Sequence, residues 1–293
     1  MHKIIVITGP TAVGKTKLSI ELAKKYDGEI INADAVQVYK GLDIGSAKVT
    51  EEEKEGIPHH LLDFKEVTEE YTIYHYQKDC REKIKDIQSR NKTPILVGGT
   101  GLYIKAALYD YKLSEEKSTN TYDNLTNEEL YEELKKLDKD IVIDKDNRRR
   151  LIRAINYYKE NNESINKNKT NKLLYNVIFI GLTTDRQVLY DKINKRVDEM
   201  ISQGLLEEVK SFYDKGIKSK PLLNAIGYRE LYNYLDGNCT KEEAIEKIKQ
   251  NSRHYAKRQY TFFNHQLPVV WFETDYNNFN NTIEKVASYI DSN

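Results

Sequence analysis

Eight residues near the start of the chain match the phosphate-binding pattern G-x-x-x-x-G-K-[ST] at every fixed position and form a P-loop motif. They are Gly9, Pro10, Thr11, Ala12, Val13, Gly14, Lys15 and Thr16. The apolar run before them predicts a strand, and the amphipathic segment after them predicts a helix. In this context the backbone N–H groups of the loop and the helix N-terminus form a cradle for phosphate oxygens. Lys15 adds a positive charge and the Thr16 hydroxyl can bind Mg²⁺, so the motif predicts binding of a diphosphate or triphosphate.

The composition limits the classes of partner. The chain has 293 residues, with 46 Lys and Arg against 46 Asp and Glu, so its formal net charge is zero. A nucleic acid would therefore have to be bound by local basic patches. No apolar run approaches the roughly 18 residues of a membrane span, and we expect no membrane partner. Two cysteines, Cys80 and Cys239, are too few for a disulfide framework or a zinc site, and we expect a protein of the cytoplasm.

Strand-like and helix-like segments alternate in the first half of the chain, which is typical of an α/β fold with a parallel sheet flanked by helices. Strands are predicted at residues 3–8, 29–33, 60–64, 93–97, 176–182 and 268–272. Helices are predicted at residues 15–26, 73–90, 101–108, 126–137, 147–159, 186–203, 205–213, 224–235 and 241–263. The segment 112–145 interrupts the alternation and indicates a small helical insertion, between a P-loop core at 1–111 and its helical continuation at 146–293.

Asp34 is the one good candidate for a carboxylate at the ligand-binding edge of the predicted sheet. It follows the strand at 29–33, and the carboxyl end of a parallel strand opens on the ligand crevice. The strand at 93–97 ends in glycines and Thr100, without the Asp that P-loop NTPases place near Mg²⁺. Three roles remain open for Asp34: a Mg²⁺ ligand, a general base, or the cap of the next turn.

Two basic stretches break the overall neutrality. One contains Lys145, Arg148, Arg149, Arg150 and Arg153. The other contains Lys247, Lys249, Arg253, His254, Lys257 and Arg258, with Tyr255 and Tyr260 among them. Such a stretch is most often a solvated helix face, but two of them in a neutral protein favour a contact surface for a phosphate backbone.

Taken in order, the motifs of this chain resemble those of the tRNA dimethylallyltransferases, the tRNA isopentenyltransferase family. The resemblance covers most of the chain, from about residue 3 to about residue 272. Besides the P-loop, the matching segments are residues 32–48 (NADAVQVYKGLDIGSAK), 58–63 (PHHLLD), 96–103 (LVGGTGLY), 149–154 (RRLIRA), 225–230 (AIGYRE) and 255–259 (YAKRQ).

The resemblance implies an enzyme that transfers a dimethylallyl group from dimethylallyl diphosphate to N6 of the adenosine beside the anticodon of tRNA, position 37. The P-loop would then hold the diphosphate and not ATP. Lys15, Thr16 with Mg²⁺, and Arg229 would neutralise the leaving group. Asp34 would be the base that takes a proton from the amine.

The resemblance also implies a monomer that binds the anticodon stem-loop and extrudes the target adenine from it. The implied tRNA contacts are Asp34, Ala35, Val36, Gln37, Thr100, Arg149, Arg150 and Arg153. Three other functions are weighed against this one: prenylation of free adenine nucleotides, a P-loop kinase or NTPase, and RNA binding without catalysis.

The chain departs from the family pattern mainly in its insertion. That segment is shorter than is usual, and residues 144–147 read Asp-Lys-Asp-Asn where His-Pro-Asn-Asp is common. Phe262 stands where a Trp is common. These differences are compatible with a diverged paralogue whose grip on the anticodon arm is altered.

Overall fold

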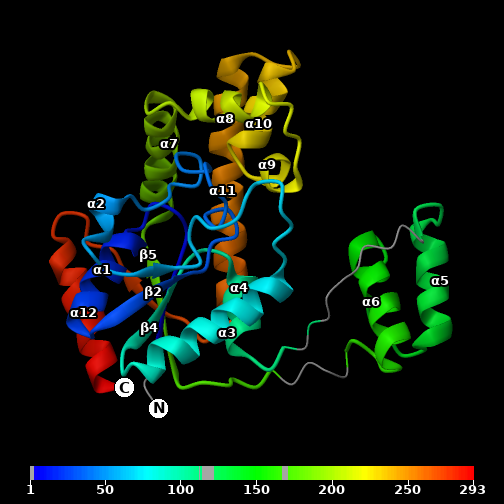
Figure 1. Ribbon diagram of the computed structural model, residues 1–293, viewed down its shortest axis with the longest axis horizontal. Helices are drawn as coiled ribbons and strands as arrows, with labels where there is room; N and C mark the ends of the chain where they lie inside the picture. The colour runs from blue at the N-terminus through cyan, green and yellow to red at the C-terminus, as the bar shows by residue number, and fades with distance from the viewer. Residues whose placement is uncertain (1–2, 112, 114–121, 167–170) are drawn as a thin grey trace. The chain divides into compact units, whose positions relative to one another are not determined.

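The computed structural model describes residues 3–111, 113, 122–166 and 171–293 (Figure 1). It divides into two compact units. The larger unit consists of Met1–Ala107 and Tyr175–Asn293, and the smaller one of Leu108–Leu174. No helix in the described ranges combines the length and the apolar character needed to cross a membrane.

The larger unit is built on a six-stranded parallel sheet with the strand order β3-β2-β4-β1-β5-β6. The strands are β1 (Ile4–Thr8), β2 (Gly28–Asn32), β3 (His59–His60), β4 (Thr93–Val97), β5 (Val177–Thr183) and β6 (Val270–Glu273). Every residue of β1 and β2 is buried, as expected for central strands that are covered on both faces. The predicted α/β fold with a parallel sheet is therefore confirmed, although β3 is shorter than predicted and begins one residue earlier.

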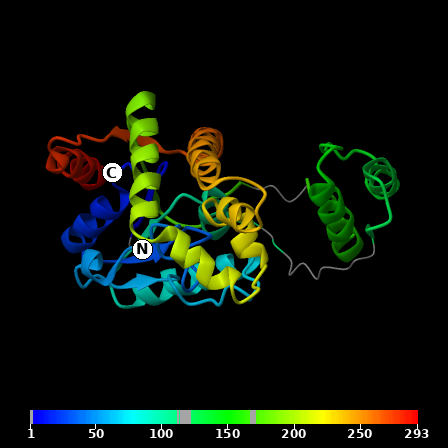
Figure 2. The same ribbon diagram turned by 90° about the horizontal axis from the view of Figure 1, so that it is seen from above.

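Helices of the larger unit cover the sheet and extend beyond one end of it. They are α1 (Lys15–Lys25), α2 (Glu51–Lys54), α3 (Ile73–Ser89), α4 (Gly101–Leu108, whose last residue belongs to the smaller unit), α7 (Arg186–Ser202), α8 (Leu205–Tyr213), α9 (Lys220–Asn224), α10 (Tyr228–Leu235), α11 (Lys241–Gln266) and α12 (Phe279–Ser292). One apolar cluster joins β1 and β5 to α1, α7 and α12. Figure 2 shows α12, in red, alongside α1, in blue, where Lys25 pairs with Asp291 at 2.8 Å.

The helix predicted at 224–235 begins four residues later in the structure, as α10 at Tyr228, and the separate short helix α9, which was not predicted, ends at Asn224. The break lies at Gly227, whose φ of 96° lies outside the helical range and suits glycine. Glu230 then closes the start of α10, because its Oε2 accepts a hydrogen bond from the backbone N–H of Gly227 at 2.8 Å.

The smaller unit is a pair of helices, α5 (Asn127–Leu137) and α6 (Arg148–Asn161). Their apolar faces share one core that includes Leu130, Leu134, Leu151 and Ile155. The insertion predicted at 112–145 covers only the first part of this unit, because α6 buries its apolar stripe against α5. Residues 112 and 114–121 of the predicted insertion lie outside the described residues.

Candidate active site

The P-loop connects the end of β1 to the start of α1. A Cβ atom at Gly9 would lie 2.4 Å from the carbonyl oxygen of Leu182 on β5, so the loop can pass this strand only with glycine at that position. Gly14 is the N-cap residue of α1 with a φ of 91°, and it provides no side-chain cap. The N–H groups of the first turn of α1 are therefore open to an anion.

The segment that follows β6 supports the P-loop from behind. The Thr274 hydroxyl donates a hydrogen bond to the carbonyl oxygen of Val13 at 3.0 Å, and the Tyr276 hydroxyl donates to that of Ala12 at 3.2 Å. Ala12 has a φ of 65°, which is uncommon for a residue with a side chain. These two bonds hold the loop in a conformation that its own sequence does not favour.

Two cations share the P-loop. Nζ of Lys15 donates a hydrogen bond to the carbonyl oxygen of Pro10 at 2.5 Å, and Nη1 of Arg196 donates to the Thr11 hydroxyl at 3.2 Å. The pKa of Lys15 is lowered to about 7, mainly by burial and secondly by the charge of Arg196, while the charge of Asp34 partly opposes both effects. Burial also lowers the pKa of Arg196. A polyanion bound to this loop would remove the mutual repulsion of the two cations.

Sequence reasoning missed Arg196, although its position carries a signal. It lies on α7, whose buried residues are Leu189, Ile193 and Val197. Arg196 is seven residues after Leu189 and three after Ile193, so it continues the apolar stripe of the helix with a charged side chain. A cation on the buried face of a helix needs a polar partner, and here that partner is the P-loop.

Asp34 lies directly beyond β2 and caps the turn that follows it. Its Oδ1 accepts hydrogen bonds from the backbone N–H groups of Val36 at 2.8 Å and Gln37 at 3.4 Å. Its Oδ2 has no hydrogen-bond partner among the described residues. The carboxylate charge acts on both Lys15 and Arg196 and offsets part of the lowering of their pKa values. Capping and a chemical role are therefore compatible, since each can use a different oxygen.

The glycine-rich segment after β4 lies against the Asp34 turn. The Thr100 hydroxyl accepts a hydrogen bond from the backbone N–H of Ala35 at 3.0 Å, and the Thr100 N–H donates to the carbonyl oxygen of Ala33 at 3.0 Å. A Cβ atom at Gly98 would lie 2.2 Å from that same carbonyl oxygen. The structure thus brings together Thr100 and the turn at residues 34–37, which the sequence analysis assigned to one surface.

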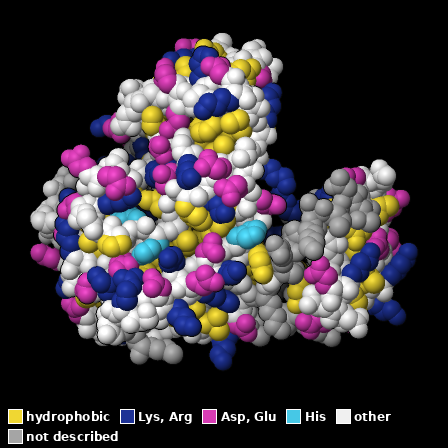
Figure 3. All heavy atoms as spheres, viewed as in Figure 1, with side chains coloured by type: hydrophobic (Ala, Val, Ile, Leu, Met, Phe, Trp, Pro, Cys, Tyr) yellow, Lys and Arg dark blue, Asp and Glu magenta, His cyan; other side chains and the backbone are white. Residues whose placement is uncertain are grey.

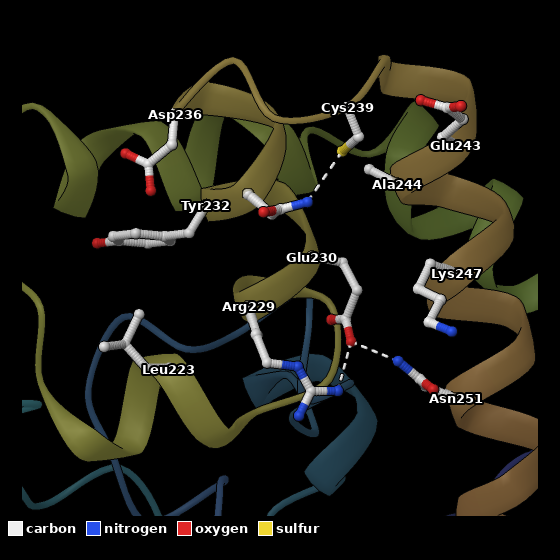
Figure 4. Close-up of a pocket in the computed structure, with 11 residues that line it drawn as sticks. Leu223, Arg229, Glu230, Tyr232, Asp236, Cys239, Glu243, Ala244, Lys247 and Asn251 are labelled. Atoms are coloured by element: carbon white, nitrogen blue, oxygen red, sulfur yellow. Dashed lines mark hydrogen bonds and ion pairs between the residues drawn. The ribbon is translucent and has the colours of Figure 1, made fainter.

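Arg229 lies elsewhere in the larger unit. It is the second residue of α10, next to a cavity of about 640 Å³ that α10 and α11 line, and its Nη2 donates to Oε1 of Glu230 at 2.7 Å (Figure 4). The amide of Asn251 on α11 binds the same oxygen from the other side. No contact in the described ranges joins Arg229 to the P-loop. The arginine that contacts the P-loop is Arg196, and the role of Arg229 at the diphosphate stays a prediction.

The two basic stretches lie in different units. Arg149 and Arg150 are exposed on α6, and Arg153 is half-buried on the same helix, so all three belong to the smaller unit. On α11, Lys249 pairs with Asp198 of α7 at 2.8 Å. Figure 3 shows basic and acidic side chains interspersed over the visible face, in keeping with the zero net charge.

Comparison with known proteins reveals the family. A family model described as IPP transferase matches residues 37–266. The chain belongs to the IPP transferase family. A tRNA dimethylallyltransferase of Anoxybacillus flavithermus is 50% identical to it, over 99% of this chain and 96% of the relative.

Solved structures agree with this IPP transferase assignment. The tRNA isopentenylpyrophosphate transferase of Bacillus halodurans has 42% identity and a TM-score of 0.78, covering 100% of this chain and 96% of that one. A eukaryotic dimethylallyltransferase acting on tRNA has 29% identity and a TM-score of 0.89, covering 100% and 79%. The family resemblance and the fold predicted from the sequence are therefore confirmed.

The lowered pKa of Lys15 predicts pH-dependent binding of an alkyl diphosphate. Above about pH 7 the free amine is mostly neutral, so binding must take up a proton, and the Kd should rise by about tenfold per pH unit. The terminal phosphate ionises near pH 6 and adds little to this dependence. Calorimetric titration between pH 7 and pH 9 measures the effect.

The control for this titration is Lys15→Arg, whose guanidinium stays charged throughout the range and should give a Kd that is independent of pH. If the unaltered protein also bound with constant affinity from pH 7 to pH 9, the ammonium of Lys15 would not have the depressed pKa.

Proposed function

We propose that this protein transfers the dimethylallyl group of dimethylallyl diphosphate to N6 of the adenosine beside the anticodon of tRNA, at position 37. The observation that carries the proposal is the pairing of a two-cation P-loop with a carboxylate that keeps one oxygen unbonded. The new N–C bond forms as the C–O bond to diphosphate breaks. The diphosphate leaves with the bonding electron pair, and a proton of the amine moves to Asp34.

The P-loop serves the leaving group in this reaction. Charge accumulates on the diphosphate as the C–O bond breaks, and preorganised positive groups stabilise that charge. Lys15 of α1 and Arg196 of α7 both donate hydrogen bonds to oxygen atoms of the P-loop. Arg196 therefore takes the role that the sequence analysis gave to Arg229.

The hydroxyl of Thr16 would hold a Mg²⁺ ion at the P-loop. Thr16 is exposed in the first turn of α1, and its hydroxyl has no hydrogen-bond partner among the described residues. A protein-bound Mg²⁺ ion usually keeps several water ligands and takes others from the substrate phosphates, so it needs few ligands from the protein. The lack of a cluster of three or more His, Cys, Asp or Glu side chains in the described ranges is compatible with such a site. When bound, the ion would supply further charge neutralisation to the diphosphate.

Asp34 serves the acceptor. The exocyclic amine of adenine is a weak nucleophile because its lone pair is delocalised into the ring, so removal of its proton during attack is useful. The amine can reach a carboxylate only if the base leaves the stack, and extrusion is least costly in a loop of RNA. Ala35, Val36, Gln37 and Thr100 would contact the extruded base and its neighbours.

The basic residues outside the P-loop are assigned to the RNA backbone. Arg149, Arg150 and Arg153 would bind phosphates of the anticodon stem-loop from the smaller unit, and Arg229 would do so from the larger one. The monomeric state and the cytoplasmic location expected from the sequence stay predictions. Sedimentation with and without tRNA tests the first of them.

The direct test is transfer of a labelled dimethylallyl group to tRNA that lacks the modification. We expect label in N6-(dimethylallyl)adenosine after nuclease digestion, and none on AMP. Asp34→Asn should lower kcat by about 10²- to 10⁴-fold, because the amide cannot take the proton. Its oxygen can still cap the turn, so the Kd of the diphosphate should change by less than about threefold.

Each other outcome points to another function. Label on AMP alone would indicate a nucleotide prenyltransferase, and release of phosphate from ATP would indicate an NTPase. A large loss of diphosphate affinity in Asp34→Asn would make Asp34 a metal-site residue and not the base.

The two arginine assignments predict different effects on diphosphate binding. Arg196→Gln should weaken it by about 10- to 100-fold, which is the effect of losing one charge-assisted hydrogen-bonding partner. Arg229→Gln, the matched control in the same unit, should leave the Kd within about twofold. Calorimetry with dimethylallyl diphosphate at pH 7 measures both values of Kd. If Arg229→Gln weakened binding and Arg196→Gln did not, Arg229 would be the arginine that binds the diphosphate.

The assignment of α6 to the RNA predicts a change in salt dependence. Replacing Arg149, Arg150 and Arg153 together by Gln should reduce the slope of log K against log salt by about 0.7 to 0.9 for each lost phosphate contact. The control variant, in which Lys78, Lys83 and Lys85 of α3 are together replaced by Gln, should show the same slope as the unaltered protein. Filter binding of tRNA over a salt series measures this slope. Equal slopes in all three proteins would show that the arginines of α6 are solvated and do not contact RNA phosphates.

A further inference from the structure

One carboxylate holds the loop that follows the catalytic candidate. This loop, residues 34–48, is called the base loop here because its first four residues are the proposed contacts of the adenine. The carboxylate is that of Glu208 on α8, and it accepts four hydrogen bonds. Its donors are the backbone N–H groups of Asp43 (3.1 Å), Ile44 (2.8 Å) and Gly45 (3.1 Å) and the hydroxyl of Tyr228.

The four donors make a small anion site that the protein fills with its own side chain. Three successive backbone N–H groups that converge on one carboxylate form a nest, a geometry that favours negative charge. Tyr228 is fully buried, and burial together with the charge of Glu208 raises the pKa of its hydroxyl. A Cβ atom at Gly45 would lie 2.5 Å from the Tyr228 ring, so this part of the loop fits tightly against α10.

Hydrogen bonds continue from this nest to Asp34. The amide Nε2 of Gln37 donates to the carbonyl oxygens of Ser46 at 3.0 Å and Ala47 at 3.2 Å, the residues directly after the nest. The backbone N–H of Gln37 in turn donates to Oδ1 of Asp34 at 3.4 Å. The path from Glu208 to the candidate base therefore consists of backbone and side-chain hydrogen bonds within one loop.

The apolar side of the same contact comes from α8 as well. The ring of Phe212, one turn after Glu208, lies 3.0 Å from where a Cβ atom would stand at Gly41. Lys48 stiffens the loop internally, because its ammonium donates to the carbonyl oxygen of Tyr39 at 2.7 Å and pairs with Asp43 at 2.6 Å. Glu208 thus attaches a loop that is already stiff, and its loss would shift the loop as a unit.

We propose that Glu208 is a positioning residue for the transfer reaction: by filling the nest at residues 43–45 it fixes the base loop, and with it the carboxylate of Asp34, relative to the P-loop. This inference depends on the proposed function, because it assigns a role within that reaction. Glu208 acts through the loop and touches neither substrate in this scheme.

The test is Glu208→Gln, which keeps the size of the side chain but turns one acceptor oxygen into a donor that faces the donors of the nest. We expect kcat for tRNA prenylation to fall by about 10- to 100-fold, as a displaced reacting group does. The KM for dimethylallyl diphosphate should stay within about twofold, since the P-loop is untouched. Glu207→Gln, one residue away on the exposed side of α8, is the matched control and should behave like the unaltered protein.

Hydrogen exchange, measured together with kcat, distinguishes a positioning role of Glu208 from a purely structural one. Exchange at the N–H groups of residues 43–45 should become at least about tenfold faster in Glu208→Gln. Faster exchange with an unchanged kcat would reduce Glu208 to a structural contact and overturn the proposal. A lower kcat with unchanged exchange would overturn it as well, because the effect would not pass through the loop.

Tyr228→Phe repeats the test if Glu208→Gln does not fold. It removes one of the four donors and keeps the buried ring, so we expect the same pattern with a fall in kcat of about three- to tenfold. Full activity of Tyr228→Phe together with faster exchange at residues 43–45 would again contradict the proposal. If the unaltered protein transfers no prenyl group, the proposed function fails. If it is active and Glu208→Gln is equally active, only the present inference fails.

Discussion

The parallel pairing of β1 with β4 on one side and β5 on the other decides where the candidate active-site groups lie. Ile5 of β1 pairs with Ile95 and with Ile178. The carboxyl ends of these strands therefore reach one edge of the sheet together. There β1 continues into the P-loop, β2 continues to Asp34, and β4 continues to Thr100. Because β1 and β2 are buried throughout, a slip of one residue would disturb the packing on both faces of the sheet. The hydrophobic core thus fixes three chemically important loops that are far apart in the sequence.

The electrostatics of this edge favour a bound polyanion over the free protein. Lys15 and Arg196 lie at the same loop, and burial opposes the charged form of each. Within the larger unit, Asp34 is the carboxylate whose charge acts on both of them. Two half-buried cations at one loop are unfavourable for the free protein, although the charges of Glu53 and Glu199 also act on Arg196. A diphosphate would provide the missing negative charge, so binding energy and the relief of repulsion come from the same contact.

Sequence reasoning predicted the local features well and the long-range ones poorly. The helices at 101–108 and 205–213 lie at the predicted residues, and the strands, apart from β3, lie within about two residues of their predicted positions. Asp34 and Thr100 were expected at one surface, and the structure joins their segments. Arg196 was missed because its role depends on the packing of α7 against a loop 185 residues earlier in the chain. The same limit explains α12, whose asparagine-rich start concealed a helix that is fixed by its packing on α1, and Glu208, whose partners are loop N–H groups that no sequence pattern reveals.

The start of α10 links two parts of the larger unit that the sequence does not connect. Tyr228 donates its hydroxyl to the carboxylate that holds the base loop, while its neighbour Arg229 faces the cavity beside α11 and pairs with Glu230. Glu230 is buried and also accepts a hydrogen bond from Asn251, so the start of α10 contacts both the base loop and α11. If an RNA phosphate at Arg229 and an adenine at the base loop both acted on this helix start, each would change the affinity for the other by the same free energy, because linkage is reciprocal. The tRNA backbone would then contribute to the placement of Asp34 as well as to affinity, which a free nucleotide could not do.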